Sequence, residues 1–414
     1  MQHLFTSDFF TTNRKNLRRK LPDAVHMVVM TANGLQQKSN DTTYSFSQDR
    51  NFWYLTGLEE PNITLVLDGA NEYLSMPKSN AVRDTFDGAI SEDELTHRSG
   101  IRAILSYEEG WKRLSATLSH QKTVGVCASG PLFQQTMGLY VHPARRVLLE
   151  KLRRLARGVA LSDIRPILAR LRQIKQLPEI AAITEAVRIT TDALEIIRKQ
   201  TSLQRYSYEY ELEAALSYEF RKQGAGGHAY SPIVAAGKHA TTLHYVANSG
   251  PLGQEDLIVV DVGAEYNLYA ADITRTLSIT PPSSRQKNVV EAVREVQQQA
   301  SRLLRPGCYL RDYETKVVSY MGEKLKSLGL ITSTHDTQAI RHYFPHATSH
   351  FLGLDVHDVG DYSKALVPGM VLTCEPGIYI PEEGIGVRIE DDIVITDSGN
   401  HNLSRHCSYL PFDV

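Results

Sequence analysis

The fold of the C-terminal part is decided by residues 258–279, which read IVVDVGAEYNLYAADITRTLSI. Apolar residues lead into one aspartate and away from another, which predicts two strands of a hairpin with Tyr266 and Asn267 at the turn. Asp261 and Asp272 are equally distant from that turn, so we expect them to lie directly opposite each other. Opposed side chains have Cβ atoms about 4.5–5.5 Å apart. The hairpin therefore predicts two neighbouring carboxylates in an apolar setting.

A second hairpin is predicted for residues 372–396, with residues 381–384 as its turn. It places Glu375 opposite Glu390, and alternation along the strand puts Glu390 and Asp392 on one face. Four facing carboxylates repel one another and are costly to bury without compensation. Cations are the natural compensation, so the two hairpins together predict a metal site.

Each carboxylate also has a purely structural explanation. Asp261 interrupts a buried strand, and considered alone it is better explained by a buried ion pair with Arg275 or Arg388. Glu390 could belong to a solvated acidic turn, but the isoleucines on both sides favour a strand. The second carboxylate predicted opposite each of them favours the metal site.

Three histidines, His346, His350 and His357, fall close together in one apolar, glycine-containing segment. A single buried histidine is usually a satisfied core residue, whereas three in one segment favour a functional site. His244 carries little information by itself and is better explained by packing.

The predicted ligand set consists of four carboxylates and one imidazole, without a thiolate. This hard, oxygen-rich set suits Mn²⁺, with Co²⁺, Fe²⁺ and Zn²⁺ as further possibilities. Two ions about 3.5–4 Å apart would share and activate a water near neutral pH. The residues therefore predict a hydrolase.

Length and composition place the chain in an ordinary class. Its 414 residues, 42% of them apolar, exceed what one core usually holds, which favours two domains. A formal charge of −2 gives no indication of a nucleic-acid or membrane partner. The chain has no long apolar run, its start does not resemble a secretory signal, and its four cysteines are far apart. We therefore expect a cytoplasmic protein.

Secondary-structure patterns divide the chain near residue 172. The first part alternates apolar strands with a basic helix, predicted at residues 24–30, 63–67, 123–127 and 145–157. This pattern indicates an α/β domain over residues 1–172. A helix predicted over residues 179–200 opens a second domain, residues 173–414. Further helices are predicted at residues 210–221, 289–304 and 312–328.

Five motifs in the second domain resemble the signature of the pita-bread metallopeptidases. They are IVVDVG (258–263), YAADITRT (269–276), SHFLGLDVHDVG (349–360), EPGIY (375–379) and GVRIEDD (386–392). Within that group the chain is similar to the Xaa-Pro aminopeptidase family, also called aminopeptidase P. YSFSQDRNFWYLTG (44–57) resembles the motif of that family's N-terminal domain. The resemblance implies an α/β N-terminal domain and an α+β catalytic domain of the pita-bread (creatinase/aminopeptidase-type) fold.

The resemblance also implies a role for each candidate residue. The family's dinuclear manganese ligands match Asp261, Asp272, His350, Glu375 and Glu390. Asp272 and Glu390 match the ligands that bridge both ions. His357 and His244 match catalytic histidines that hold the substrate backbone and the developing oxyanion. Glu375 also matches the group that carries the proton from water to the leaving amine.

A second set of residues surrounds these ligands. Arg388 resembles the family arginine that orients Glu390 and the metal-ligand carboxylate behind it. His346 lies where the family also has a histidine, which either lines the site or is merely structural. Tyr230 and residues 346–357 are expected to form an apolar face for a proline ring. The expected reaction releases the N-terminal residue from peptides with proline in the second position, a bond whose nitrogen carries no hydrogen.

Three other functions are compatible with the same motifs. Prolidase uses the same five ligands on dipeptides, and the sequence alone does not reveal the preferred substrate length. Non-catalytic pita-bread binding modules typically lose metal ligands, and creatinase-type amidinohydrolases lack the metal set, whereas here all five positions are present. The resemblance further implies a homo-oligomer, a dimer or tetramer. The turn at residues 381–384 is shorter than in several family members. The contacts that a longer loop would make to the substrate or to a neighbouring subunit are therefore not predicted for this chain.

Overall fold

The computed structural model describes residues 4–78, 81–128, 142–409 and 411–412. The chain divides into two compact units, Met1–Leu171 and Arg172–Val414. The boundary expected from the sequence, between residues 172 and 173, lies one residue away. Within the described ranges, no helix is both long enough and apolar enough to cross a membrane.

A mixed sheet forms the centre of the N-terminal unit, with β1 antiparallel to β2 and parallel to β5. Its strand order is β4-β3-β2-β1-β5-β6. The strands are β1 (Met27–Thr31), β2 (Thr64–Asp68), β3 (Asn71–Ser75), β4 (Ile104–Leu105), β5 (Thr123–Val126) and β6 (Ala160–Asp163). The helices are α1 (Ser7–Lys20), α2 (Arg50–Thr56), α3 (Ala81–Asp87), α4 (Glu92–Ser99), α5 (Tyr107–Leu118), α7 (Pro143–Leu155) and α8 (Arg165–Gln173). The predicted α/β class of this unit is confirmed.

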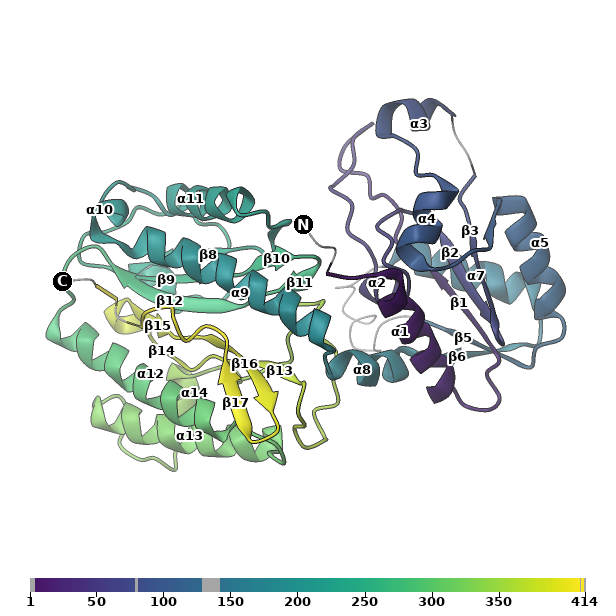
Figure 1. The fold of residues 1–414 in the computed structure, drawn as a ribbon. Coiled ribbons are helices and arrows are strands. Elements are labelled where there is room, and N and C mark those ends of the chain that lie inside the picture. The colour runs from purple at the N-terminus through teal and green to yellow at the C-terminus, as the bar shows by residue number, and fades with distance from the viewer. Residues whose placement is uncertain (1–3, 79–80, 129–141, 410, 413–414) are drawn as a thin grey trace. The chain divides into compact units, whose positions relative to one another are not determined.

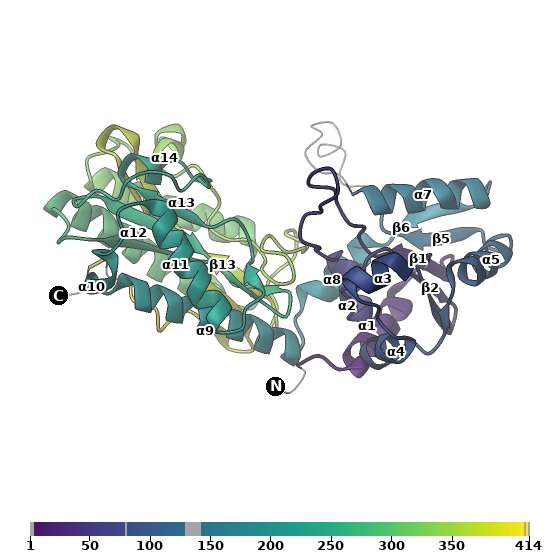
Figure 2. The same cartoon turned by 90° about the horizontal axis from the view of Figure 1, so that it is seen from above.

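Leucines of α5 and α7 cover this sheet, and Figure 2 shows α7 lying along it. Met27 and Val29 alternate along β1 and are buried in one cluster with Leu114 of α5 and Leu152 of α7. Strand residues two positions apart share a face, so α7 contacts β1 and α5 contacts β3 and β4 around one shared cluster.

The C-terminal unit packs helices on both sides of small antiparallel sheets (Figure 1). Its helices are α9 (Leu177–Arg198), α10 (Gln200–Leu203), α11 (Glu209–Lys222), α12 (Ser284–Leu303), α13 (Leu310–Ser327) and α14 (Thr337–Tyr343), with the 3-10 turns η1 (Gly237–Thr241) and η2 (Pro381–Glu383). Its strands are β7 (Gly227–His228), β8 (Ile233–Ala236), β9 (Leu257–Val262), β10 (Ala264–Tyr266), β11 (Tyr269–Ala270), β12 (Ile273–Ser278), β13 (Val371–Cys374), β14 (Gly377–Ile380), β15 (Ile385–Arg388), β16 (Asp391–Thr396) and β17 (Gly399–Asn402). α9 contacts β10, β11 and β12, whereas α12 contacts β13, β14 and β15 and is backed by α13. The predicted α+β class is confirmed.

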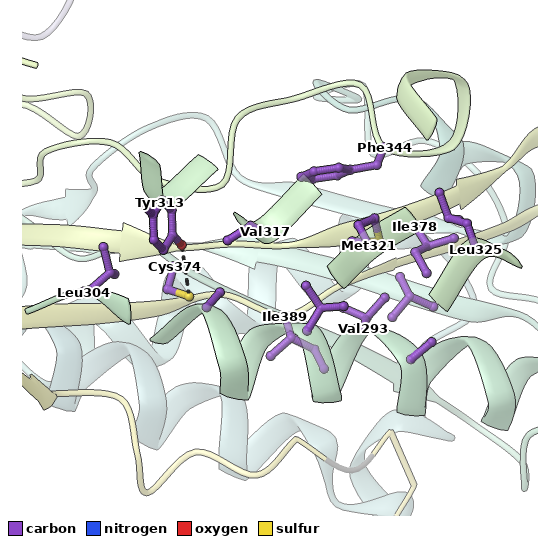
Figure 3. Packing of buried hydrophobic residues seen from close by; sticks show 14 of the residues in the cluster. Val293, Leu304, Tyr313, Val317, Met321, Leu325, Phe344, Cys374, Ile378 and Ile389 are labelled. Carbon is purple, nitrogen blue, oxygen red and sulfur yellow. Dashed lines mark hydrogen bonds between the residues drawn. The ribbon is translucent and has the colours of Figure 1, made fainter. Parts of the chain in front are cut away.

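The main core of the C-terminal unit lies between α12, α13 and the second hairpin (Figure 3). Val293 of α12 and Met321 of α13 are buried in the same cluster as Ile378 of β14. Tyr313 of α13 donates a hydrogen bond to Sγ of Cys374 at 3.6 Å, drawn as a dashed line in Figure 3. Cys374 ends β13, so this core fixes the strand that leads into a predicted metal ligand.

The first hairpin forms with a register that differs from the predicted one. Asp261 of β9 is the partner of Thr274 in β12, and Asp272 lies just before β12. The turn centres on Asn267 and Leu268, with φ of 49° and 66°, one residue further along than predicted. The predicted direct opposition of Asp261 and Asp272 is therefore wrong. A shift of two residues preserves the face, however, so the two carboxylates still point to the same side.

The second hairpin has the predicted register. β13 pairs with β16 and β14 pairs with β15 in one continuous register, which puts Glu375 and Glu390 at corresponding positions between the two strand pairs. Neither glutamate is itself in a strand. The predicted turn at residues 381–384 is observed as η2 followed by Gly384, whose φ of 63° favours glycine.

Candidate metal centre

A pocket of about 330 Å³ lies in the C-terminal unit beside the two hairpins. The candidate residues predicted from the sequence all line it: Tyr230, His244, Asp261, Asp272, His346, His350, His357, Glu375, Arg388 and Glu390. The remaining lining residues are Ser231, Ile233, Leu243, Val246 and Val356. Titratable and apolar side chains from distant parts of the sequence therefore share one cavity.

The first hairpin contributes two carboxylates that are joined by a phenol. Oη of Tyr230 lies 2.5 Å from Oδ1 of Asp261 and 2.6 Å from Oδ1 of Asp272. A phenol has one proton, so it donates to one of these carboxylates at a time. Burial, with help from both aspartates, raises the pKa of Tyr230 well above its ordinary value. The hydroxyl of a residue expected only to form an apolar face thus links two predicted ligands.

His350 brings together carboxylates from both hairpins. Its Nε2 lies 3.4 Å from Oδ2 of Asp272 and 3.5 Å from Oε1 of Glu375. One ligand atom each from Asp272, His350 and Glu390 lie within 4.8 Å of one another. Asp261, like Glu375, lines the same pocket without belonging to that tightest group.

Arg388 contacts Asp261, as the purely structural explanation of that aspartate allowed. Its Nη2 donates a hydrogen bond to Oδ2 of Asp261, and its Nε donates to Oγ1 of Thr274 at 3.0 Å. Thr274 in turn donates to Oε2 of Glu390 at 2.6 Å. β15 contacts β9, which brings this arginine to Asp261. The ion pair of Arg388 with Asp261 is therefore observed, whereas the expected link of Arg388 to Glu390 is indirect and runs through Thr274.

Arg275, the other alternative partner for Asp261, lies with a different carboxylate. Its Nη2 is 2.7 Å from Oδ1 of Asp391, in a fully buried pair. The next residue, Asp392, accepts a hydrogen bond from the backbone N–H of Asp272 at 3.0 Å. Alternation along β16 therefore sends Asp391 away from the candidate ligands and Asp392 toward them, as predicted.

Three further histidines line the pocket. Nε2 of His346 lies 2.9 Å from Oη of Tyr379, and the rings of His350 and His357 meet edge to face with centroids 4.3 Å apart. Burial lowers the pKa of His346 to about 4, and burial together with His350 lowers the pKa of His357 below its ordinary value. Both rings are therefore neutral at pH 7. His244 lines the pocket from a separate loop, residues 237–250.

The electrostatics of the pocket fit a divalent cation. Burial raises the pKa of Glu375 to about 7 and that of Glu390 well above its ordinary value, and repulsion from Asp272 and Asp261 adds to both shifts. Burial alone would lower the pKa of His350, but Asp272 and Glu375 raise it to about 9. A cation would offset this repulsion, and carboxylates with one imidazole are donors that divalent ions accept. The residues present therefore fit the predicted metal.

Some contacts that shape the site were not predicted. Thr274 lies between Arg388 and Glu390, and Tyr379 accepts a hydrogen bond from Arg388 at 3.0 Å. The sequence holds a signal for Thr274, which follows Asp272 by two residues and so shares its face. Tyr379 gives no such signal, because its partner lies on the neighbouring strand.

Comparison with known proteins identifies the family. Residues 181–397 match the family model of metallopeptidase family M24, and residues 10–126 match that of the aminopeptidase P N-terminal domain. Xaa-Pro aminopeptidase from Escherichia coli (strain K12) is 35% identical over 405 residues, which cover 91% of this chain and 90% of that protein. Xaa-Pro aminopeptidase 3 from Rattus norvegicus is 33% identical over 408 residues, covering 92% and 78% respectively.

The fold matches solved structures at similar identity. Aminopeptidase P from E. coli with the inhibitor Pro-Leu gives a TM-score of 0.86 at 30% identity, covering 98% of this chain and 96% of that chain. The zinc-substituted form of E. coli aminopeptidase P in complex with product gives a TM-score of 0.85 at 31% identity with the same coverage. The predicted pita-bread fold is confirmed. This chain belongs to metallopeptidase family M24 and carries its catalytic domain behind an aminopeptidase P N-terminal domain.

Proposed function

We propose that this protein is a metal-dependent Xaa-Pro aminopeptidase, which hydrolyses the bond between an N-terminal residue and a following proline. The observation that carries this proposal is the pocket in which the four carboxylates and His350 of the family signature meet. Relatives named Xaa-Pro aminopeptidase align with nearly the whole chain, which favours this activity over that of prolidase. The complete set of candidate ligands disfavours a non-catalytic binding module.

The proposed cofactor is a pair of Mn²⁺ ions. The residues that would hold them are Asp261, Asp272, His350, Glu375 and Glu390, with Asp272 and Glu390 shared. Bound divalent ions supply Lewis acidity and lower the pKa of a water. Mn²⁺ is favoured because carboxylate oxygens outnumber the single imidazole. Aminopeptidase P from E. coli has also been solved in a zinc-substituted form, so we expect other divalent ions to bind as well.

The remaining polar residues are proposed to hold the peptide and move its proton. The rings of His357 and His244 each carry an N–H, which would donate to the substrate backbone and to the carbonyl oxygen as it gains negative charge. Glu375 would carry the proton to the leaving amine. Asp261 is less suited to this role, because Tyr230 and Arg388 already form hydrogen bonds with its carboxylate.

Selectivity for proline is proposed to arise from the apolar part of the pocket wall. Ile233, Leu243, Val246 and Val356 line the pocket beside the candidate ligands. A proline nitrogen carries no hydrogen, so a site for proline has to recognise the ring by shape rather than by an N–H donor. His346 and the ring of Tyr230 would complete this surface.

Hydrolysis of Xaa-Pro-Xaa tripeptides, measured with and without added Mn²⁺, tests the activity. We expect release of the first residue, near-absence of cleavage of matched Xaa-Ala-Xaa peptides, loss of activity on chelation and recovery with Mn²⁺. Comparable kcat/KM values for the two peptides would contradict the assignment. Cleavage confined to Xaa-Pro dipeptides would assign prolidase instead. Elemental analysis should find two ions per chain in active protein, and one ion or none would exclude the dinuclear centre.

A cytoplasmic homo-oligomer, a dimer or a tetramer, is proposed as the working state. The four cysteines, Cys127, Cys308, Cys374 and Cys407, are free thiols, which is typical of a reducing compartment. The oligomer is proposed from the family resemblance. Sedimentation at assay concentration tests it, and a monomer would remove the assembly without affecting the chemistry.

A further inference from the structure

Glu209 is a buried carboxylate that lies outside the candidate metal centre. It occupies the first turn of α11, and none of its surface is exposed. Its two oxygens accept four hydrogen bonds: from Ala236 N at 2.9 Å, His239 Nδ1 at 2.9 Å, Tyr245 Oη at 2.9 Å and Gly250 N at 2.6 Å. A buried carboxylate with this many donors fixes the groups that donate to it.

These four donors lie in one loop, residues 237–250, or directly before it. Ala236 ends β8 just before the loop and Gly250 closes it, so Glu209 joins its two ends. Within the loop, the rings of His239 and Tyr245 stack with centroids 4.4 Å apart, which connects the first turn of the loop to its far side. A Cβ on Gly250 would lie 2.5 Å from the ring of His239, so the loop closes tightly around the carboxylate.

The same loop forms one wall of the pocket. Leu243, His244 and Val246 line the pocket, and Tyr245, between two of them, is held by Glu209. Tyr245 directly follows His244 in the sequence, so the hydrogen bond that fixes its side chain also restricts the backbone at His244. Compact loops whose ends meet and whose own side chains fill them are a common way of presenting functional groups.

We propose that Glu209 is a positioning residue, which holds the 237–250 loop so that His244 and its apolar neighbours face the substrate. This inference rests on the proposed aminopeptidase function. Glu209 itself does not touch the pocket, and its effect runs through the loop. Small displacements of an aligned group cost about 10²-fold in rate, so a loop that carries a catalytic imidazole needs such an anchor.

A carboxylate is required at position 209 because all four partners of this side chain donate hydrogen bonds to it. Glutamine offers one oxygen and an NH₂ group that would face the N–H of Gly250 or Ala236. Glu209→Gln therefore keeps the size of the side chain and removes about half of its acceptors. Glu211→Gln is the matched control, since Glu211 lies in the same turn of α11 and caps it by accepting from the backbone N–H groups of Tyr208 and Ser207 rather than from the 237–250 loop.

A double-mutant cycle with His244→Ala tests the inference on the intact, metal-loaded chain. We expect Glu209→Gln to lower kcat/KM for an Xaa-Pro-Xaa peptide about 10–100-fold, with unchanged metal content, and Glu211→Gln to leave both near wild type. In the His244→Ala background, Glu209→Gln should have little further effect, because the group it positions is gone. Full additivity, or unchanged kcat/KM in Glu209→Gln, overturns the proposal.

Hydrogen exchange provides a readout that does not depend on the substrate. Amides of residues 236–250 should exchange faster in Glu209→Gln than in Glu211→Gln, while those of β9 and β12 stay protected. If Glu209→Gln does not fold, Tyr245→Phe removes a single donor and should show a smaller effect of the same kind. A wild-type protein that cleaves no Xaa-Pro peptide would refute the proposed function, whereas unchanged exchange in the loop would refute the positioning role.

Discussion

Asp272 contacts residues of the candidate centre that come from distant parts of the sequence. Its carboxylate lies beside Tyr230 and His350, and its backbone N–H donates to Asp392. We expect Asp272→Asn to lose metal and activity together, since in the proposed centre this residue would be shared by both ions. His357→Ala should keep both ions and lower kcat about 10²–10³-fold, the usual effect of removing a transition-state donor. Elemental analysis and tripeptide hydrolysis measure the two effects, and a metal-free His357→Ala protein would show that His357 has been misassigned.

Asp49 offers a stability prediction in the N-terminal unit. Burial alone would raise its pKa, but hydrogen bonds from His142 and from the N–H of Phe52 and the charge of Arg145 hold the pKa below its ordinary value. The unfolded pKa is about 3.9 and the folded pKa lies below it, so the stabilisation is complete above about pH 5 and is lost as pH falls through the folded pKa. Asp49→Asn should lower the free energy of unfolding at pH 7 by about 1.5–3 kcal/mol.

Tryptophan fluorescence during urea unfolding measures this effect. Both tryptophans of the sequence, Trp53 and Trp111, lie in the N-terminal unit, so the signal reports that unit within the intact chain. Glu150→Gln, which breaks an exposed pair with Arg146, is the control and should change stability by less than about 1 kcal/mol. A difference between wild type and Asp49→Asn that stays constant from pH 7 to pH 3 would contradict the assignment.

The sequence was sufficient to identify candidate residues that share one pocket, but it did not determine their hydrogen-bond partners. Asp261, Glu375 and the histidine segment could be found because charged or imidazole groups in apolar runs are unusual. Arg275 and Arg388 were both possible partners of Asp261, and the choice of Arg388 depends on how β15 packs against β9 rather than on any local pattern. The phenol of Tyr230 between two aspartates was missed for the same reason.

At the scale of elements, the two hairpins show why one register was predicted and the other was not. In the second hairpin, a proline and a glycine mark the turn unambiguously, as η2 and Gly384 confirm. In the first, the turn places Leu268 at φ 66°, a conformation that leucine rarely adopts, so the residue type gave no indication of it. The same-face relation of Asp261 and Asp272 survived because strand geometry repeats every two residues.

Helix starts shifted by one to five residues where capping was not recognised, and the largest shift is that of α12, which begins at Ser284 rather than at residue 289 because Ser283 caps it. α9 begins at Leu177 rather than at residue 179, because Gln176 and Glu179 form a capping box and Pro178 is tolerated in the first turn. The apolar periodicity predicted the body of this helix, and the reciprocal hydrogen bonds of the box set its start.

Substitution of Gly263 tests how tightly the first hairpin is packed. A Cβ at this position would lie 1.7 Å from the carbonyl oxygen of Ala271 and 3.0 Å from Cε1 of Tyr230. Gly263→Ala must therefore displace the backbone next to Asp272, and we expect Mn²⁺ affinity to fall about 10–100-fold, as for other supports of metal ligands. Titration calorimetry measures this affinity. Gly399→Ala is the control, since a Cβ there has open space, and equal affinities for the two variants would contradict the argument.

At the scale of the whole molecule, the boundary between the units falls beside a buried ion cluster of the C-terminal unit. Arg172 Nη2 lies 2.5 Å from Oδ1 of Asp358, and Lys175 Nζ lies 3.0 Å from Oδ2 of the same residue. Asp358 directly follows His357, so these cations secure the segment that carries a proposed catalytic group. Sequence composition predicted two domains but gave no reason for the precise cut, because Asp358 lies far along the chain from both cations.

The buried ion cluster of Arg172, Lys175 and Asp358 allows two truncated chains to be compared. A chain without residues 1–170 keeps Arg172, Lys175 and the whole C-terminal core, so we expect it to fold and bind metal while losing or relaxing its selectivity for Xaa-Pro peptides. A chain without residues 1–175 leaves Asp358 buried without either cation, and removing the partners of a buried charge costs about 3–5 kcal/mol. The second truncation should therefore melt at a lower temperature and cleave peptides more slowly than the first. Circular dichroism, metal analysis and tripeptide assays compare the two, and identical behaviour would show that the Asp358 cluster does not secure the His357 segment.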